Sequence, residues 1–206
     1  VEPRAVITLV EQYFSGWHNS LQAEPPLVSP VSKPGNTVRK HITLQGKSQA
    51  DIVMGSIGPQ RSSEDYLPAS LGNNILGRFG MMGRIGDVVR EQSGLAYHAS
   101  TSLNAWVSAG SWEVSAGVNP SNLQKAIDLI IHELERYVTE PVTAAELSDS
   151  KSNYIGRLPL SMESNAGVAN ALTGLERFQL GLNYYREYPE KISRITEEQI
   201  LRCAQK

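Results

Sequence analysis

The sequence predicts an α+β fold in which an antiparallel sheet carries helices packed on one face. Strand patterns gather in the first part of the chain, ahead of a tail in which helical patterns follow one another. The connections between these strand patterns are too short for the crossovers that parallel strands require. The expected order is one helix, two strands, helices, three strands and then helices.

The length and composition describe an ordinary globular domain. The 206 residues suit a single domain that buries its core without disulfides or metals. With 40% hydrophobic residues and a formal net charge of -2, the chain lacks the basic surface expected for nucleic-acid or membrane partners. No apolar run reaches the roughly 18 residues that span a bilayer, and there is no signal-peptide pattern. Because the sequence begins with Val1, we expect residues 1–206 to be one unit of a longer chain, and its compartment stays open.

The N-terminal part is expected to hold one helix and one extended segment. Arg4 to Trp17 places its apolar residues at nearly helical spacing. Leu21 to Asn36 contains several prolines without periodicity, and proline fits neither helix interiors nor central strands. This segment is therefore predicted to be an extended crossover.

Two strands and a helix are predicted next. Thr37 to Leu44 alternates apolar and polar residues, whereas Ala50 to Ile57 is apolar on both faces, so the second strand is expected to be the more central. Gln45-Gly46-Lys47 is suited to a turn between them. Ser63 to Leu76 is expected to be a helix with Ser63 as its N-cap and acidic residues in its first turn.

The same patterns give the remaining elements. A short helix is expected over Asp87 to Arg90, followed by strands at Leu95 to Leu103, Ala105 to Ala109 and Ser111 to Val118. The clearest helix is Asn122 to Val138, whose apolar residues recur at positions i, i+3, i+4 and i+7. Further helices are predicted from Thr143, where Glu146 completes a capping box, and over 166–180 and 196–204.

Motifs of a self-sufficient active site are absent from the sequence. Gly77, Gly80 and Gly83 match neither a P-loop nor a dinucleotide fingerprint, and they indicate close packing between helices. His132 opens a His-Glu-x-x sequence that lacks the second histidine of a zinc motif, and it falls on the solvent side of its predicted helix. Cys203 has no neighbouring base or metal ligand. No metal or cofactor site is therefore assigned to this chain.

Arg90 and Tyr97 are the candidate functional residues. Arg90 is expected to point away from the buried stripe of its short helix, and Tyr97 to lie at the start of a strand on the same face as Ala99. On residue type alone, Arg90 could equally be a solvated cation at a helix end. Tyr97 could equally be a half-buried strand aromatic with its hydroxyl hydrogen-bonded.

The residues around this pair carry a family resemblance. The segment from Asn74-Ile75-Leu76-Gly77 to Val89-Arg90-Glu91-Gln92-Ser93-Gly94-Leu95-Ala96-Tyr97 closely resembles the C-terminal half-domains of pitrilysin and insulinase-type metallopeptidases. The specific part is Arg-x6-Tyr within Arg-x3-Gly-Leu-Ala-Tyr. Weaker likenesses, such as Gln49 to Gly55 and Ser161 to Ser164, extend it over nearly the whole chain.

The resemblance implies a metallohydrolase half-domain, like those of mitochondrial processing peptidase and pitrilysin, that pairs with a homologous half around a chamber. It implies that Tyr97 donates a hydrogen bond to the oxyanion of a peptide substrate and that Arg90 holds a substrate carbonyl. The chain has no His-x-x-Glu-His, so zinc is expected in the partner half, in the same polypeptide or in a separate subunit. The expected function is the non-metal half of a zinc metalloendopeptidase, inactive alone. The alternative is a non-catalytic binding or scaffolding subunit of the same fold.

Overall fold

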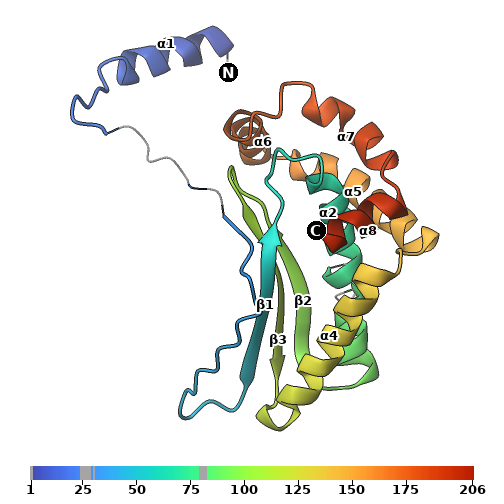
Figure 1. Cartoon of the computed structure of the whole chain (residues 1–206). Coiled ribbons are helices and arrows are strands. Elements are labelled where there is room, and N and C mark those ends of the chain that lie inside the picture. The colour runs from blue at the N-terminus through green and yellow to red at the C-terminus, as the bar shows by residue number, and fades with distance from the viewer. Residues whose placement is uncertain (1, 24–28, 30, 79–82) are drawn as a thin grey trace.

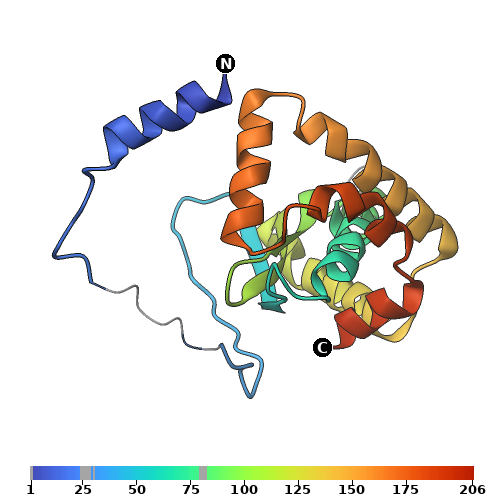
Figure 2. The same ribbon diagram turned by 90° about the horizontal axis from the view of Figure 1, so that it is seen from above.

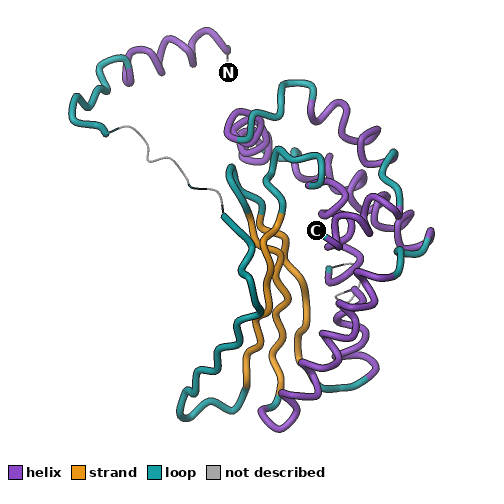
Figure 3. The backbone as a smooth tube through the Cα atoms, viewed as in Figure 1, coloured by secondary structure: helices purple, strands orange, loops and turns teal. Residues whose placement is uncertain are grey.

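The sheet has three antiparallel strands in the described part of the chain. The structure is a computed structural model that describes residues 2–23, 29, 31–78 and 83–206. Its strands are β1 (Ala50–Gly58), β2 (Ala96–Asn104) and β3 (Gly110–Val118), in the spatial order β1-β3-β2. β2 and β3 form a hairpin, and β1 pairs with the other side of β3 along its whole length (Figure 3). β3, and not β1, is therefore the central strand.

Helices cover one face of this sheet, as the sequence predicts (Figure 1). The helix layer consists of α2 (Tyr66–Gly77), α3 (Gly83–Gly86), the π-helix η1 (Asp87–Gln92), the 3₁₀ turn η2 (Pro120–Asn122), α4 (Leu123–Thr139), α5 (Ala144–Ser161), α6 (Asn165–Arg177), α7 (Tyr184–Ser193) and α8 (Glu197–Gln205). The predicted α4 is confirmed, and so is the capping box in which Thr143 and Glu146 bond each other's backbone at the start of α5. α7 lacks a sequence prediction. None of the described helices has the length and hydropathy needed to cross a bilayer.

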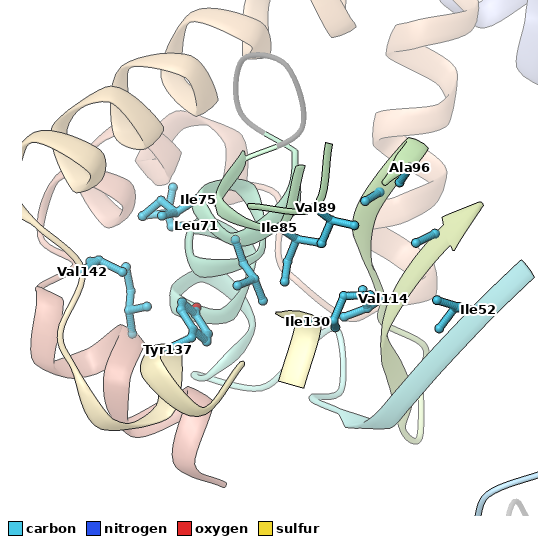
Figure 4. Packing of buried hydrophobic residues seen from close by; sticks show 14 of the residues in the cluster. Ile52, Leu71, Ile75, Ile85, Val89, Ala96, Val114, Ile130, Tyr137 and Val142 are labelled. Carbon is cyan, nitrogen blue, oxygen red and sulfur yellow. The ribbon is translucent and has the colours of Figure 1, made fainter. Parts of the chain in front are cut away.

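The hydrophobic core lies between the helix layer and the covered face of the sheet (Figure 4). Along β3, Val114, Ala116 and Val118 are buried, and they pack with Ile52 of β1 and Ile130 of α4. This alternation is what a sheet with one covered face requires, since successive side chains point to opposite faces. α2 runs through the middle of the layer, with every residue from Pro68 to Gly77 buried.

Close backbone approaches explain two of the three glycines in the Gly77 to Gly83 segment. A Cβ on Gly77 would lie 2.4 Å from the backbone nitrogen of Thr101 on β2. Gly83 has a φ of +65°, and a Cβ there would meet the carbonyl oxygen of Ile75 at 2.5 Å. The predicted close packing is thus confirmed for Gly77 and Gly83, but at Gly77 the neighbour is strand β2 and not a helix, and Gly80 lies outside the described residues.

The predicted strand at Thr37 to Leu44 is wrong. These residues form no ladder with β1, and Val38, Ile42 and Leu44 are exposed. Alternation of apolar and polar residues describes a strand only where a sheet face is buried beneath it, and no core lies beneath this segment. A hydrogen bond of 3.0 Å from Arg39 Nη2 to Gln124 Oε1 nevertheless links the segment to α4.

Two other boundaries also differ from the sequence prediction. Ala105 to Ala109 is the connection between β2 and β3 and not a strand, because the chain must reverse within these five residues to form the hairpin. α2 begins at Tyr66, and its N-cap is Asp65 instead of Ser63. The Ser63 hydroxyl accepts a hydrogen bond from the Asp65 N–H and so stabilises the turn before the helix.

The helix predicted near the N-terminus is confirmed as α1 (Pro3–Phe14), but it contributes nothing to the core. None of its residues is buried, and Figures 1 and 2 show it apart from the helix layer. Its amphipathic stripe, which includes Val10 and Phe14, is exposed. The described core is therefore built by residues 50–206 alone.

Candidate half-site around Arg90 and Tyr97

A tight connection joins η1 to β2 and fixes the chain between Arg90 and Tyr97. The carbonyl oxygen of Arg90 accepts hydrogen bonds from the N–H groups of Ser93 and Gly94, and that of Val89 accepts one from Leu95 N–H at 3.0 Å. Gly94 has a φ of +63°, in the left-handed region that favours glycine at the end of a helix. The glycine of the Arg-x3-Gly-Leu-Ala-Tyr motif is thus the residue that lets the helix end and the strand begin.

Arg90 lies on the π-helix η1, with its backbone anchored and its side chain available. Ile85 and Val89 are fully buried on the inner side of the α3 and η1 segment. The Arg90 side chain is 32% exposed, and its Nε lies 3.4 Å from Glu91 Oε1. The expectation that Arg90 points away from the buried stripe is confirmed. π-helical turns are rare and occur often at functional sites.

Tyr97 lies at a β-bulge that turns it outward. The register of β2 against β3 shifts between Ala96, which pairs with Val118, and His98, which pairs with Gly117. Tyr97 is 86% exposed, whereas Ala99 is completely buried. The expectation that these two residues share a face is therefore wrong, because the extra residue of the bulge breaks the alternation between them.

The open face of the sheet, opposite the helices, carries mostly small and polar side chains. It carries the outward-facing residues of all three strands, such as Asp51, Ser100, Glu113 and Ser115, together with the exposed Val53. At the bulge end, a Cβ on Gly117 would lie 2.5 Å from Gln49 Nε2 and 2.7 Å from His98 Cε1, so those two side chains lie across this glycine. This face presents mainly hydrogen-bonding groups, and Val53 is its exposed apolar residue.

Chemically, Arg90 and Tyr97 can donate hydrogen bonds but cannot generate a nucleophile. No hydrogen bond or ion pair joins them, and no described residue is bonded to the Tyr97 hydroxyl. A guanidinium and a phenol suit the stabilisation of negative charge on an oxygen atom.

The described residues do not fit a zinc site. No group of three His, Cys, Asp or Glu side chains lies close enough together among them to hold a metal ion. His132 is exposed on α4, as the sequence predicts. Burial and the neighbouring Asp65 carboxylate raise the pKa of the Cys203 thiol to about 12, so this cysteine is neither a thiolate ligand nor a nucleophile at neutral pH.

A buried ion network holds the helical segment that carries Arg90, and the sequence patterns did not reveal it. The Arg84 guanidinium bonds both carboxylate oxygens of Glu146 at 2.6 Å and lies 3.8 Å from Glu133 Oε1. Glu133, only 2% exposed, also forms an ion pair with Arg136, whose Nη2 lies 3.0 Å from Glu133 Oε1. The network ties α3, which runs directly into η1, to α4 and to the start of α5.

The electrostatics of the two carboxylates in this network differ. The hydrogen bonds from Arg84 and from Thr143 lower the pKa of Glu146 to about 2. Burial raises the pKa of Glu133 above its ordinary value, although the two arginines act in the opposite direction. The capping box revealed one role of Glu146, but its contact with Arg84 spans 62 positions and leaves no local signal.

Comparison with known proteins identifies the family. The model of the peptidase M16 inactive domain matches residues 1–154, which is most of the chain. This chain belongs to the peptidase M16 family, as an inactive domain. The family resemblance carried by the Arg-x6-Tyr motif is thereby confirmed.

The curated relatives of this M16 inactive domain are uncharacterized zinc proteases. One from Bacillus subtilis is 28% identical over 148 residues, covering 72% of this chain and 36% of that protein. One from Mycobacterium leprae is 27% identical over 208 residues, covering 97% of this chain and 45% of that protein. The chain thus spans less than half the length of these relatives.

Solved structures agree with the α+β fold. The peptidase M16 inactive domain from Pseudomonas fluorescens has a TM-score of 0.71 and 26% identity, covering 77% of this chain and 38% of that chain. A protease from Helicobacter pylori has a TM-score of 0.85 and 20% identity, covering 99% of this chain and 49% of that chain. The predicted fold class, an antiparallel sheet with helices on one face, is confirmed.

Proposed function

We propose that this chain is the non-metal half of a zinc metalloendopeptidase. Residues 1–206 form one half-domain, the open face of the sheet forms part of a substrate chamber, and a homologous zinc-bearing half completes the site in the same polypeptide or in another subunit. Three observations support this proposal. The chain belongs to the inactive-domain family, its relatives are named zinc proteases, and the described residues hold no cluster that could bind a metal.

The outward-turned hydroxyl of Tyr97 is the observation that carries the proposal. A half-buried structural tyrosine would place its ring in the core and its hydroxyl against a partner. Tyr97 instead has an exposed side chain beside the open face, and a bulge is what turns it there. Bulges are over-represented next to active sites, where they re-aim a side chain. Arg90 lies on an equally unusual backbone, one turn of π-helix.

The proposed chemistry is electrostatic stabilisation of the transition state. When water attacks a peptide carbonyl, negative charge develops on its oxygen, and a fixed donor at that atom lowers the barrier. In the proposal, Tyr97 donates a hydrogen bond from its phenolic O–H to this oxyanion, while Arg90 binds a neighbouring substrate carbonyl and positions the peptide. The partner half supplies the zinc that activates the water, and this chain supplies only donors.

The proposal is tested by replacing Tyr97 with Phe in the intact protein and measuring cleavage of a quenched peptide. Loss of one oxyanion donor lowers kcat by about 10²- to 10³-fold. Because Tyr97 is exposed and makes no described hydrogen bond, the Tyr97→Phe variant should unfold at the same temperature as wild type. Tyr13→Phe, at an exposed tyrosine of α1, is the matched control. Equal cleavage by Tyr97→Phe and wild type would support the scaffolding alternative instead.

A further inference from the structure

The helix layer contains a second candidate site, a polar cleft between α2, α5 and α7. The cleft has a volume of about 370 Å³ and reaches the last part of β2 at Leu103. Ligand pockets for small molecules begin at roughly 300 Å³, so the cleft can hold one. Leu103 lies six residues after Tyr97, which corresponds to about 20 Å along a strand. The cleft is therefore separate from the half-site at the other end of β2.

Two asparagines of α2, Asn73 and Asn74, line the cleft. Asn73 of α2 is only 3% exposed, and its Oδ1 accepts a hydrogen bond from Trp112 Nε1 at 2.9 Å. This bond fixes the orientation of the amide and leaves the Asn73 NH₂ group without a partner among the described residues. The neighbouring Asn74 donates to Ser150 Oγ at 3.1 Å. The Asn73 amide nitrogen can therefore donate a hydrogen bond to a polar ligand in the cleft.

The lining also carries aromatic and positively charged residues. Tyr154 and Tyr188 line the cleft, and the Tyr154 hydroxyl is held by a 2.9 Å hydrogen bond to the Ser70 carbonyl oxygen. Arg78 and Arg157 are exposed residues of the lining, and neither has an acidic partner among the described residues. Both are close enough to oppose the rise in the pKa of Tyr154 that its burial causes.

The sign of the charge indicates the class of ligand. No acidic residue occurs among the described residues that line the cleft, although the whole chain has a formal net charge of -2. Two guanidinium groups without acidic partners and an amide donor in one lining match an anionic headgroup, since arginine binds carboxylate and phosphate through several parallel hydrogen bonds. The tyrosine walls match a planar apolar body.

We propose that the cleft between α2, α5 and α7 binds a small organic anion, a carboxylate or phosphate attached to a planar ring. The headgroup lies between Arg78 and Arg157 and reaches the Asn73 amide. The ring lies against the tyrosines. This site goes beyond the proposed peptidase half-site, because it needs neither Arg90 nor Tyr97 and faces the helix layer instead of the open sheet face.

The test measures binding of four probes that share one ring system to the intact protein, by ligand-observed NMR and calorimetry. The probes are 2-naphthyl phosphate and 2-naphthoate as anions, 2-naphthalenemethanol as the neutral analogue and 2-naphthylmethylamine as the cation. We expect either or both anions to bind at least about tenfold more tightly than the neutral and cationic probes, from the strength of hydrogen bonds between charged groups. The tighter of the two anions identifies the preferred headgroup.

The double variant Arg78→Gln and Arg157→Gln is expected to weaken anion binding by about tenfold or more. Both residues are exposed, so the fold should survive the change. Arg186→Gln, an exposed arginine of α7 outside the cleft lining, is the matched control and should bind like wild type. Absence of anion binding at millimolar concentration, equal binding of the neutral probe, or an unchanged affinity in the double variant would each overturn the proposal. None of these readouts involves peptide cleavage, so the outcome is independent of the peptidase proposal.

Discussion

The two faces of the sheet place similar residues in opposite situations. Val114 on the covered face is 4% exposed, whereas Val53 on the adjacent strand and the open face is 72% exposed. The covered face packs against α2, α3 and α4, and the open face meets no helix of the described core. Stability is therefore concentrated between the sheet and the helix layer, whereas the proposed donors Tyr97 and Arg90 lie outside this core. Substitutions in the core and at the two donors should separate folding from activity.

The largest expected effect is on the covered side, at Arg84. Arg84→Met would leave Glu146 without its guanidinium partner and the buried Glu133 with Arg136 alone. Breaking a buried ion pair by removing one member lowers the free energy of unfolding by about 3 to 5 kcal/mol. The measurement is urea unfolding followed by circular dichroism.

Arg194→Met is the control for this change, because its ion pair with Glu190 lies on an exposed helix surface. Surface pairs contribute about 0 to 1 kcal/mol. If both variants lost equal stability, the network around Arg84 would not be what holds α3 against α4 and α5.

At the candidate site, Arg90→Gln should lower activity and spare stability. Its described ion pair with Glu91 is partly exposed, so the free energy of unfolding should stay within about 0.5 kcal/mol of wild type. Loss of a charged hydrogen bond to a substrate carbonyl should lower kcat/KM for a peptide by about tenfold to hundredfold. Arg186→Gln again serves as the control. A large loss of stability in Arg90→Gln would place Arg90 among the structural residues.

The valine pair gives the most direct comparison of the two faces. Val114→Ala should lower the free energy of unfolding by about 2 kcal/mol, because it removes two buried carbon groups and leaves a cavity. Val53→Ala should change it by less than about 0.5 kcal/mol, since its side chain is already in contact with water. The measurement is thermal unfolding of both variants. Equal losses of stability in Val114→Ala and Val53→Ala would mean that the open face is covered in the intact protein.

The last expected effect is acid sensitivity through Glu146. Its pKa is lowered to about 2 in the folded protein, below its ordinary value of 4.5. A lowered pKa means that the stabilisation is present above pH 4.5 and is lost as the pH falls toward 2. The difference in thermal midpoint between wild type and Glu146→Gln should therefore narrow over this interval. A constant difference in thermal midpoint would mean that Glu146 does not contribute to the loss of stability in acid.

The sequence predicted what depends on local pattern. The amphipathic stripe of α4 and the capping box at Thr143 follow from residue spacing, and both are confirmed. The strands β2 and β3 were also expected, but the additional strand at Ala105 to Ala109 was not found. The strand expected at Thr37 to Leu44 failed because alternation says nothing about whether a partner strand or core is present. Glu133 was hidden for a related reason, since a carboxylate is assigned to the surface unless its distant partners Arg84 and Arg136 are known.

At the candidate site, too, the sequence predicted what depends on local pattern and missed what depends on long-range contacts. Arg90 and its outward direction followed from helical spacing together with the family motif. The exposure of Tyr97 did not, because it depends on pairing between β2 and β3 that no local pattern encodes. The cleft between α2, α5 and α7 also escaped the sequence, since its lining comes from four elements far apart in the chain.

The bulge at Tyr97 and the π-turn at Arg90 share one geometric property: each accommodates one residue more than the regular element would. Deletions would therefore act differently from substitutions at these places. Removing one residue from η1 would rotate everything before it by about 100° relative to β2. Removing one residue at the bulge would move the side chains before it to the opposite sheet face. The direction of Arg90 and Tyr97 thus depends on the number of residues in η1 and at the bulge as well as on their identity. A deletion of one residue would redirect both donors even if Arg90 and Tyr97 themselves were kept.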